Sequence, residues 1–289
     1  MQTVVELKNV NKKIKKQTIL EEVNIKLTKG KIYGLVGSNG SGKSTLIKTI
    51  LGLYKCKGQV IINGYDIKKD YKNVIGKIGT IVDYVSFYDY LSAYENLRYF
   101  ANLYEVPMER VREVMKTVKL DKFDNKAVRY YSLGMKQRLG LAISLLKDPE
   151  ILILDEPMNG LDPRGIVELR NLLLSFKDKT IIISSHLISE IEKIVDEVIF
   201  INNKKVITKS LEKSSLKKPV KIKVDNYEKL KRIINIPSFN EKEILYMSDE
   251  ETAKLNSKLV NNNVKVYRLE EENSLENILL KMMDGDKND

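Results

Sequence analysis

The sequence predicts an α/β fold built on a mostly parallel β-sheet, with a group of helices inserted in its middle. Apolar strand-like segments alternate with helical segments over residues 1–208, whereas about 84–147 carries successive helices without strands. A polar stretch at 209–219 lacks periodicity and is followed by another series of short strands and helices. We therefore expect an α/β domain at 1–208 with a helical subdomain at about 84–147, a linker at 209–219 and a small α+β accessory domain at 220–289.

The first elements are strands. Residues 3–36 alternate apolar and polar side chains, and a Lys29-Gly30 turn leads into the apolar run 31–36. A glycine-rich stretch follows, and 44–51 is helical in pattern. Two further strands are expected, at 58–63 and 77–82.

The inserted segment carries helix-start signals. Ser92 and Glu95 form a capping box that opens a helix through about Tyr104. Pro107 suits the first turn of a second helix, which we expect to end near 119, and a third helix follows Ser132.

The strand and helix alternation then resumes. Residues 151–154 and 180–184 are short apolar runs typical of parallel strands buried on both faces. Between them Asp162-Pro163 begins a helix, and after them come a helix from about 188 and a strand at 197–201. In the accessory domain we expect strands in KIKV, ILYM and VKVYRL, and helices at 226–235, 250–261 and 274–283.

Composition limits the class of protein. The net charge is +11, which fits a nucleic acid or an anionic membrane as partner, or simply a lysine-rich composition. Lysine outnumbers arginine 41 to 9, whereas bidentate phosphate recognition favours arginine, so no nucleic acid partner is expected. The single cysteine, Cys56, excludes an internal disulfide and suits a reducing cytosol. The N-terminus lacks the pattern of a signal peptide, and no apolar run approaches the roughly 20 residues of a membrane helix.

One glycine-rich loop has the pattern GxxxxGK[ST]. It contains Gly37, Ser38, Asn39, Gly40, Ser41, Gly42, Lys43, Ser44 and Thr45. Such a loop wraps its N–H groups around phosphate oxygens, and the following helix N-terminus adds positive potential. We expect Lys43 to reach the β- and γ-phosphates of ATP, Ser44 to bind Mg²⁺ and Thr45 to support the phosphate contacts.

Two acidic residues follow the apolar run 151–154. Because parallel strands end together at one edge of a sheet, Asp155 and Glu156 should lie beside the phosphate loop. Asp155 is suited to hold Mg²⁺, and Glu156 to orient or deprotonate the attacking water.

The only histidine, His186, follows the strand at 180–184 and should emerge at the same edge. A neutral imidazole there can donate a hydrogen bond to the γ-phosphate or to the attacking water.

The helix that begins after Ser132 carries YSLGMKQR, just ahead of the acidic strand. With this signature the chain resembles an ABC-transporter nucleotide-binding domain over about residues 3–208. In this resemblance 160–163 (GLDP) is the D-loop, containing Asp162, and Ser185-His186 is the H-switch. It implies a P-loop ATPase core with an antiparallel β subdomain. It also implies a head-to-tail homodimer or heterodimer in which Ser132 and Gly134 of one copy contact the γ-phosphate held by Lys43 of the other.

Three positions depart from the family pattern. The family's LSGGQ reads YSLGM here, so Leu133 replaces a glycine and Met135 a glutamine. The Q-loop glutamine falls at Asp83, where a carboxylate can still bind Mg²⁺. Ile14 stands where the family places an aromatic on adenine, which loosens base recognition.

With these departures the chain resembles the bacitracin- and lantibiotic-resistance branch of bacterial ABC exporters. The resemblance implies a cytoplasmic subunit, peripheral on the inner face of the cell membrane, that energises a separate transmembrane permease. We expect aromatic residues after Asp83 partly to pack the helical subdomain and partly to form the permease surface; these are Tyr84, Phe87, Tyr88, Tyr90 and Tyr94. Two alternatives stay open: a soluble non-transport ABC ATPase, and a weakly hydrolysing partner in a heterodimer.

Overall fold

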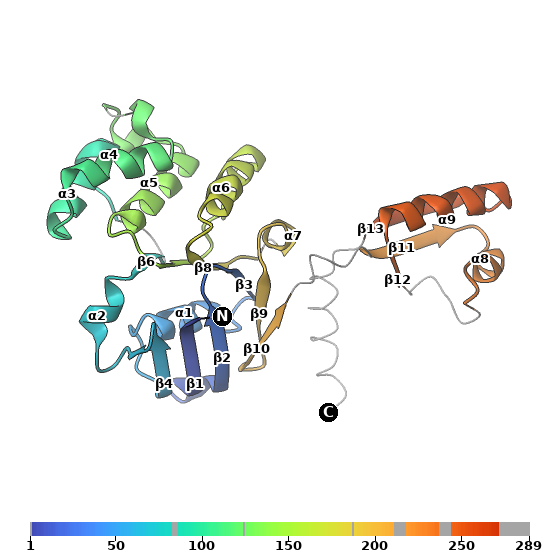
Figure 1. Ribbon diagram of the computed structural model, residues 1–289, viewed down its shortest axis with the longest axis horizontal. Coiled ribbons are helices and arrows are strands. Elements are labelled where there is room, and N and C mark those ends of the chain that lie inside the picture. Colours follow the sequence, from blue (N-terminus) through green and yellow to red (C-terminus); the bar gives the residue numbers. More distant parts are fainter. Residues whose placement is uncertain are drawn as a thin grey trace. The chain divides into compact units, whose positions relative to one another are not determined.

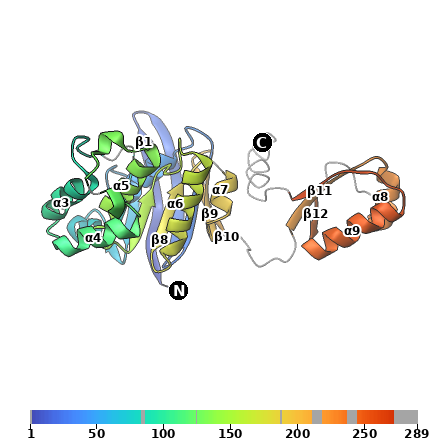
Figure 2. The same ribbon diagram turned by 90° about the horizontal axis from the view of Figure 1, so that it is seen from above.

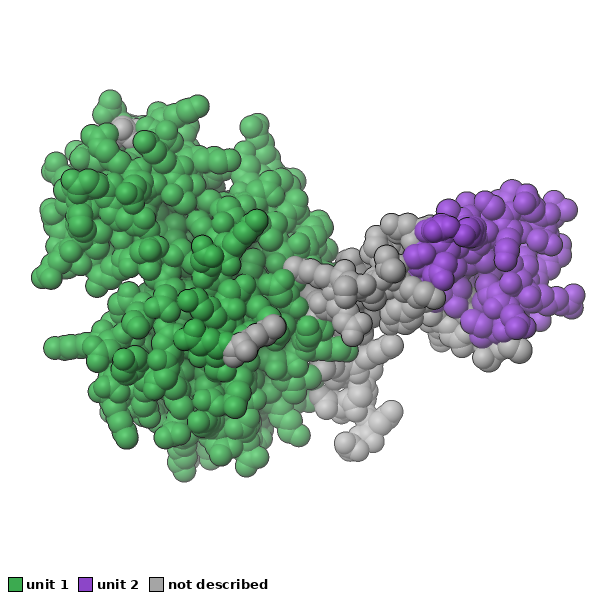
Figure 3. All heavy atoms as spheres, in the orientation of Figure 1, with its two compact units in different colours: residues 1–211 green, residues 212–289 purple. Residues whose placement is uncertain are grey.

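The computed structural model describes residues 2–82, 86–123, 125–186, 188–210, 218–236 and 244–271. The chain divides into two compact units, residues 1–211 and 212–289, coloured separately in Figure 3. Each unit has its own hydrophobic core. A strand ends at Ser210 and the next begins at Lys218, so strands occupy both ends of the stretch 209–219 that the sequence suggested as linker.

The central sheet of the first unit has six strands in the order β10-β9-β3-β8-β7-β6. Neighbouring strands are parallel except β10 and β9, which confirms the predicted mostly parallel sheet. All residues of β3, β7 and β8 are buried, which explains why these strands carry no charged side chains and are mostly apolar, with Thr180 and Ser184 as the polar ends of β8. The strands are β3 Ile32–Val36, β6 Ile78–Ile81, β7 Ile151–Leu154, β8 Thr180–Ser184, β9 Glu197–Asn202 and β10 Lys205–Ser210.

An antiparallel sheet forms a second layer of this unit, in the order β2-β1-β4-β5. Figure 1 shows β1, β2 and β4 side by side. Leu7 and Leu27 from this sheet share one core with Ile182 of β8. The strands are β1 Thr3–Ile14, β2 Gln17–Thr28, β4 Lys57–Ile62 and β5 Tyr65–Asp66.

Three helices lie side by side as a helical subdomain in Figures 1 and 2. They are α3 Ala93–Leu103, α4 Met108–Thr117 and α5 Leu133–Leu145. The predicted capping box of Ser92 and Glu95 is confirmed at the start of α3. The remaining helices of the unit are α1 Lys43–Ile50, α2 Tyr71–Ile75, α6 Pro163–Ser175 and α7 Ile188–Glu192, with 3₁₀ turns at Asp121–Phe123 and Val128–Tyr130.

The second unit is an α+β fold. Its antiparallel sheet has the order β12-β11-β13, and α8 and α9 follow β11 and β12 along the chain. Ile222, Leu230 and Leu259 are buried in its core. The elements are β11 Lys218–Val224, α8 Tyr227–Ile234, β12 Ile244–Met247, α9 Asp249–Asn261 and β13 Val266–Glu271. The helix predicted at 274–283 lies outside the described residues.

None of the helices in the described part of the chain combines the length and the apolar character that a membrane span requires.

Candidate nucleotide site

The phosphate loop joins β3 to α1 and packs tightly on its neighbours. A Cβ atom on Gly37 would lie 2.5 Å from the carbonyl oxygen of Ile201 and 2.6 Å from Ser41 Oγ. Only glycine fits this position, because real Cβ atoms do not approach heavy atoms so closely. The loop therefore packs directly against its neighbours from its first residue, Gly37, and it ends where α1 begins at Lys43.

Lys43 and Ser41 give this loop its polar groups. Lys43 is 8% exposed, and its Nζ donates to the carbonyl oxygens of Gly37 at 2.8 Å and Ser38 at 3.2 Å. Ser41 Oγ is buried, with no hydrogen-bond partner among the residues that the structure describes. A buried ammonium, an unsatisfied hydroxyl and the amides at a helix N-terminus together suit a phosphate group.

Three neighbouring strands carry the predicted residues to one edge of the sheet. β8 lies between β3 and β7, and Leu35 of β3 is in register with Ser184 of β8. The chain leaves β3 into the phosphate loop, β7 into Asp155 and β8 into His186. The parallel order therefore brings the loop, the acids and the histidine to adjacent strand ends.

Ser184 connects the two acidic residues. It is fully buried, its Oγ donates to Asp155 Oδ1 at 2.5 Å, and the same oxygen accepts from the Glu156 N–H at 2.8 Å. The sequence does not single out Ser184, because a serine at the end of an apolar strand carries no signal of its own. The fixed Glu156 backbone lies in the left-handed region, with φ of 49°.

The Glu156 carboxylate meets His186. Glu156 Oε2 lies 2.7 Å from His186 Nδ1 and accepts weakly from the His186 N–H at 3.3 Å. An ionised carboxylate only accepts hydrogen bonds, so the imidazole proton resides on Nδ1. A neutral His186 with this tautomer has an acceptor at Nε2, so donation from Nε2 to a phosphate oxygen or to water requires the protonated ring; the donation expected from the sequence stays a prediction.

The signature and D-loop residues lie at two helix starts. Ser132 caps α5 by accepting from the Met135 N–H at 3.3 Å, and Asp162 caps α6 by accepting from the Gly165 N–H at 2.7 Å. With Gly134 they line a cavity of about 420 Å³. Glu156 and Asp155 lie in a different cavity of the same chain.

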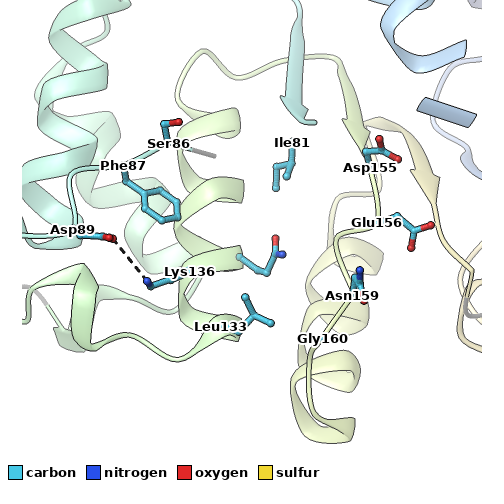
Figure 4. A pocket seen from close by; sticks show the side chains of 11 residues that line it. Ile81, Ser86, Phe87, Asp89, Leu133, Lys136, Asp155, Glu156, Asn159 and Gly160 are labelled. Atoms are coloured by element: carbon cyan, nitrogen blue, oxygen red, sulfur yellow. Dashed lines mark ion pairs between the residues drawn. The ribbon is translucent and has the colours of Figure 1, made fainter. Parts of the chain in front are cut away.

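That second cavity, of about 660 Å³, is shown in Figure 4. The strand end with Asp155 and Glu156 forms one side, and Phe87 and Asp89, from the segment before α3, form the other. Asp89 makes an ion pair of 3.7 Å with Lys136 of α5. The segment before α3 is thereby attached to the helix that begins at the signature.

A buried side chain, Asn96, holds this segment. Its Oδ1 accepts from the Tyr88 N–H at 2.8 Å, and its Nδ2 donates to the carbonyl oxygens of Tyr88 at 3.1 Å and Ser92 at 2.9 Å. A hydrogen bond from the Ser92 backbone holds the pKa of Glu95 below its ordinary value. A hydrogen bond with Tyr99 raises the pKa of Tyr88. The sequence does not single out Asn96 either, because it has the pattern of an ordinary polar helix residue.

Of the remaining predicted positions, the structure describes Ile14 but not Asp83. Asp83 lies outside the described residues. Ile14 ends β1 and is 38% exposed. No group of three or more metal-binding side chains occurs within the described ranges. Mg²⁺ needs none, since it is commonly held by one or two protein oxygens together with phosphates and water. Ser44, which is exposed beside Lys43, and Asp155 provide such oxygens.

A phosphate loop, an acidic strand end and a histidine on three adjacent parallel strands define a P-loop ATPase. The sequence pattern of the ABC transporter family matches residues 20–159. The chain is 41% identical over 208 residues to the lantibiotic transport ATP-binding protein SrtF of Streptococcus pyogenes, covering 71% of this chain and 89% of SrtF. It is 42% identical over 212 residues to the bacitracin transport ATP-binding protein BcrA of Bacillus licheniformis, covering 72% and 69%.

A solved dimeric ATP-binding cassette in a post-hydrolysis state, bound to ADP and Pi, superposes with a TM-score of 0.63 at 26% identity, covering 72% of this chain and 99% of that one. The chain belongs to the ABC transporter family and is an ATP-binding subunit of that family. Its predicted likeness to the bacitracin and lantibiotic branch is confirmed by the two curated relatives.

Proposed function

We propose that this subunit hydrolyses ATP with Mg²⁺ as a dimer and passes the resulting movement to a separate membrane permease that exports peptide antibiotics, lantibiotics or other drugs. The observation that carries the proposal is the contact between Glu156 Oε2 and His186 Nδ1 at 2.7 Å, next to Asp155. A general base needs an orienting partner within hydrogen-bond reach, and Glu156 has one.

Each residue has a task in this scheme. Lys43 and the loop amides bind and neutralise the phosphates, with Ser38, Asn39 and Gly40 forming the loop itself. Glu156 takes a proton from the attacking water, and His186 accepts at Nε2 from that water while holding the carboxylate in place. Ser44, Asp155 and Asp83 are the proposed Mg²⁺ ligands. When bound, Mg²⁺ offsets negative charge on the phosphates.

Dimer formation is supported by the signature. Ser132 and Gly134 stand at the first turn of α5, where free N–H groups suit an anion. No phosphate-loop residue of their own chain lines their cavity, which supports a phosphate supplied by a partner copy. The solved cassette cited above is a dimer, which fits this arrangement. Homodimer and heterodimer both satisfy it.

The proposed permease surface follows from exposed aromatic residues near α3. Tyr90 is 68% exposed and Tyr99 is 45% exposed, and both rings contact Tyr88 edge to face, with centroid separations of 5.9 and 5.0 Å. Amphipathic rings of this kind are enriched at protein interfaces. Phe87 lines the cavity beside Glu156, so it contributes to the site, whereas Tyr84 lies outside the described residues. The relatives' transport of a lantibiotic and of bacitracin supports the proposed cargo.

A Glu156→Gln substitution tests the catalytic assignment. Glutamine keeps the shape of the side chain but cannot take a proton, so we expect ATP hydrolysis to fall by at least about a hundredfold while ATP binding persists. Glu109→Gln, on the exposed first turn of α4, is the matched control and should hydrolyse ATP at the wild-type rate.

Two outcomes decide between the alternatives. Equal rates for Glu156→Gln and the wild type would refute the catalytic role. A weakly hydrolysing partner of a heterodimer would instead show slow turnover in both proteins and recover activity when mixed with a second ABC subunit. ATP-dependent dimers of Glu156→Gln in analytical ultracentrifugation would support the dimer, and monomers at every ATP concentration would contradict a homodimer.

A further inference from the structure

Leu133 lies over the D-loop of its own chain. It is the first residue of α5 and its side chain is 46% exposed. A Cβ atom on Gly160 would lie 2.9 Å from Leu133 Cδ2, so the leucine methyl occupies the space above that glycine. Gly160 has φ of 72°, a left-handed conformation that favours glycine. At the next position of α5, a Cβ on Gly134 would be in ordinary contact with Leu161, at 3.7 Å.

This contact separates two cavities. Leu133, Gln137 and Gly160 line both of them. One cavity contains Asp155 and Glu156, and the other contains the signature residues and Asp162. Leu133 is therefore part of the boundary between the cavity of Asp155 and Glu156 and the cavity of the signature residues.

The D-loop connects directly to Glu156. The Asn159 N–H donates to the Glu156 carbonyl oxygen at 3.1 Å, and the Leu161 N–H donates to the Met158 carbonyl oxygen at 3.3 Å. Glu156 and Gly160 are both left-handed, at φ of 49° and 72°. A non-glycine residue in that region costs free energy and depends on surrounding contacts to stay there. Leu133 provides one such contact at the far end of this turn.

We propose that Leu133 is a positioning residue that holds the turn from Glu156 to Gly160 against the start of α5. Through this turn it links the signature surface of a chain to the orientation of the Glu156 carboxylate in the same chain. The inference rests on the proposed function, because it assumes that Glu156 acts on ATP. It applies to this chain because position 133 carries a side chain large enough to reach Gly160.

A double-mutant cycle tests the contact through catalysis. Leu133→Ala should lower kcat about fivefold and leave KM within about twofold, because the lost contact affects orientation rather than nucleotide binding. Leu133→Met, which keeps length and apolar character, should restore most of the activity. Leu174→Ala, a leucine of α6 that is 41% exposed, is the matched control and should behave as the wild type.

Gly160→Ala completes the cycle. Its new methyl would displace the free end of the Leu133 side chain and so break the same contact, because that half-exposed side chain can move aside. Leu133→Ala should then add no further loss, so the double variant should exceed the product of the two single effects by about fivefold. The strain of an alanine in the left-handed conformation at position 160 is present with and without the leucine, so it cancels in the cycle. A double variant equal to that product would overturn the inference.

A second measurement needs no ATP. Hydrogen exchange, followed by mass spectrometry on the full chain, should show faster exchange of the amides in 156–161 for Leu133→Ala, but not for Leu133→Met or Leu174→Ala. Unchanged exchange in Leu133→Ala would overturn the inference while Glu156→Gln remained inactive. Equal hydrolysis by Glu156→Gln and the wild type would defeat the proposed function instead, and the exchange data would still report whether the contact holds the turn.

Discussion

At the scale of single residues, Ser184 is the group that ties the acidic strand end together. Its hydroxyl donates to Asp155 and accepts from the Glu156 N–H, and the residue is fully buried. Ser184→Ala leaves both partners without this bond, so we expect hydrolysis to fall by about tenfold, which corresponds to about 1.4 kcal/mol. Steady-state ATPase assays measure this. Ser175→Ala, an exposed serine at the end of α6, should leave the rate unchanged; a similar loss in both variants would contradict the assignment.

Candidate catalytic residues are easier to find in the sequence than the residues that position them. The positions of Glu156 and His186 in the fold could be predicted because each follows an apolar strand that ends at the ligand edge. Ser184 could not, because its role depends on the order of strands in the sheet, in which β8 lies next to β7. The proton position on His186 also needed the structure, since only the contact with Glu156 fixes which ring nitrogen donates.

At the scale of elements, Asn96 fixes the segment that precedes α3. Its side chain is fully buried and bonds to both backbone groups of Tyr88. Asn96→Ala should destabilise the first unit by about 2 kcal/mol, because the buried N–H and carbonyl groups lose their partner. Urea unfolding measures this change. The control is Asn102→Ala, because Asn102 lies on the same helix with an exposed side chain, and it should change stability by less than about 0.5 kcal/mol. Equal losses of stability in the two variants would refute the role of the Asn96 hydrogen bonds.

Asp148 links three elements through a carboxylate. It accepts from Lys179 Nζ at 2.8 Å and from Arg110 Nη2 at 3.2 Å, and Lys179 followed by Arg110 holds its pKa below the ordinary 3.8. A depressed acid pKa stabilises the folded state fully above the ordinary pKa, and that contribution is lost as pH falls through the folded value. The side chain is 70% exposed, so the contribution is below about 1 kcal/mol.

An Asp148→Asn variant should therefore be slightly less stable than the wild type at pH 7, with a gap that shrinks once the pH drops below 3.8. Urea unfolding at several pH values compares the two. Asp178→Asn, at an exposed position before β8, should track the wild type throughout. A gap that stayed constant down to the lowest pH would show that Asp148 does not act through its charge.

Element boundaries show where local patterns suffice. The helix starts at Ser92, Ser132 and Asp162 could be predicted because caps are local, and all three side chains accept from the expected backbone N–H groups. β10 was missed, since Lys205–Ser210 is polar on one side and becomes a strand only by pairing with β9. Edge strands of this kind depend on pairing with a neighbour, here β9 across the two-residue turn at 203–204.

At the scale of the whole molecule, each of the two units has a hydrophobic core of its own among the described residues. Leu46 and Ile182 belong to the core of the first unit, and Leu230 and Leu259 to that of the second. The phosphate loop and both acidic residues belong to the first unit alone. The polar stretch at 209–219 could suggest this division, but the sequence could not show which strands pair in the second unit.

The chain has two units, each with a core of its own, and the nucleotide site belongs to one of them, so we expect the units to unfold separately. Calorimetry of the full-length Glu156→Gln protein should show two transitions. ATP with Mg²⁺ binds only the folded first unit. At a hundred times its Kd it should stabilise that unit by about 2.7 kcal/mol, and it should raise the temperature of one transition only. Leu259→Ala opens a cavity in the core of the second unit and should lower its free energy of unfolding by about 2 to 5 kcal/mol. Only the temperature of the other transition should then fall. A single transition that responds to both changes would mean that the two cores unfold as one cooperative unit.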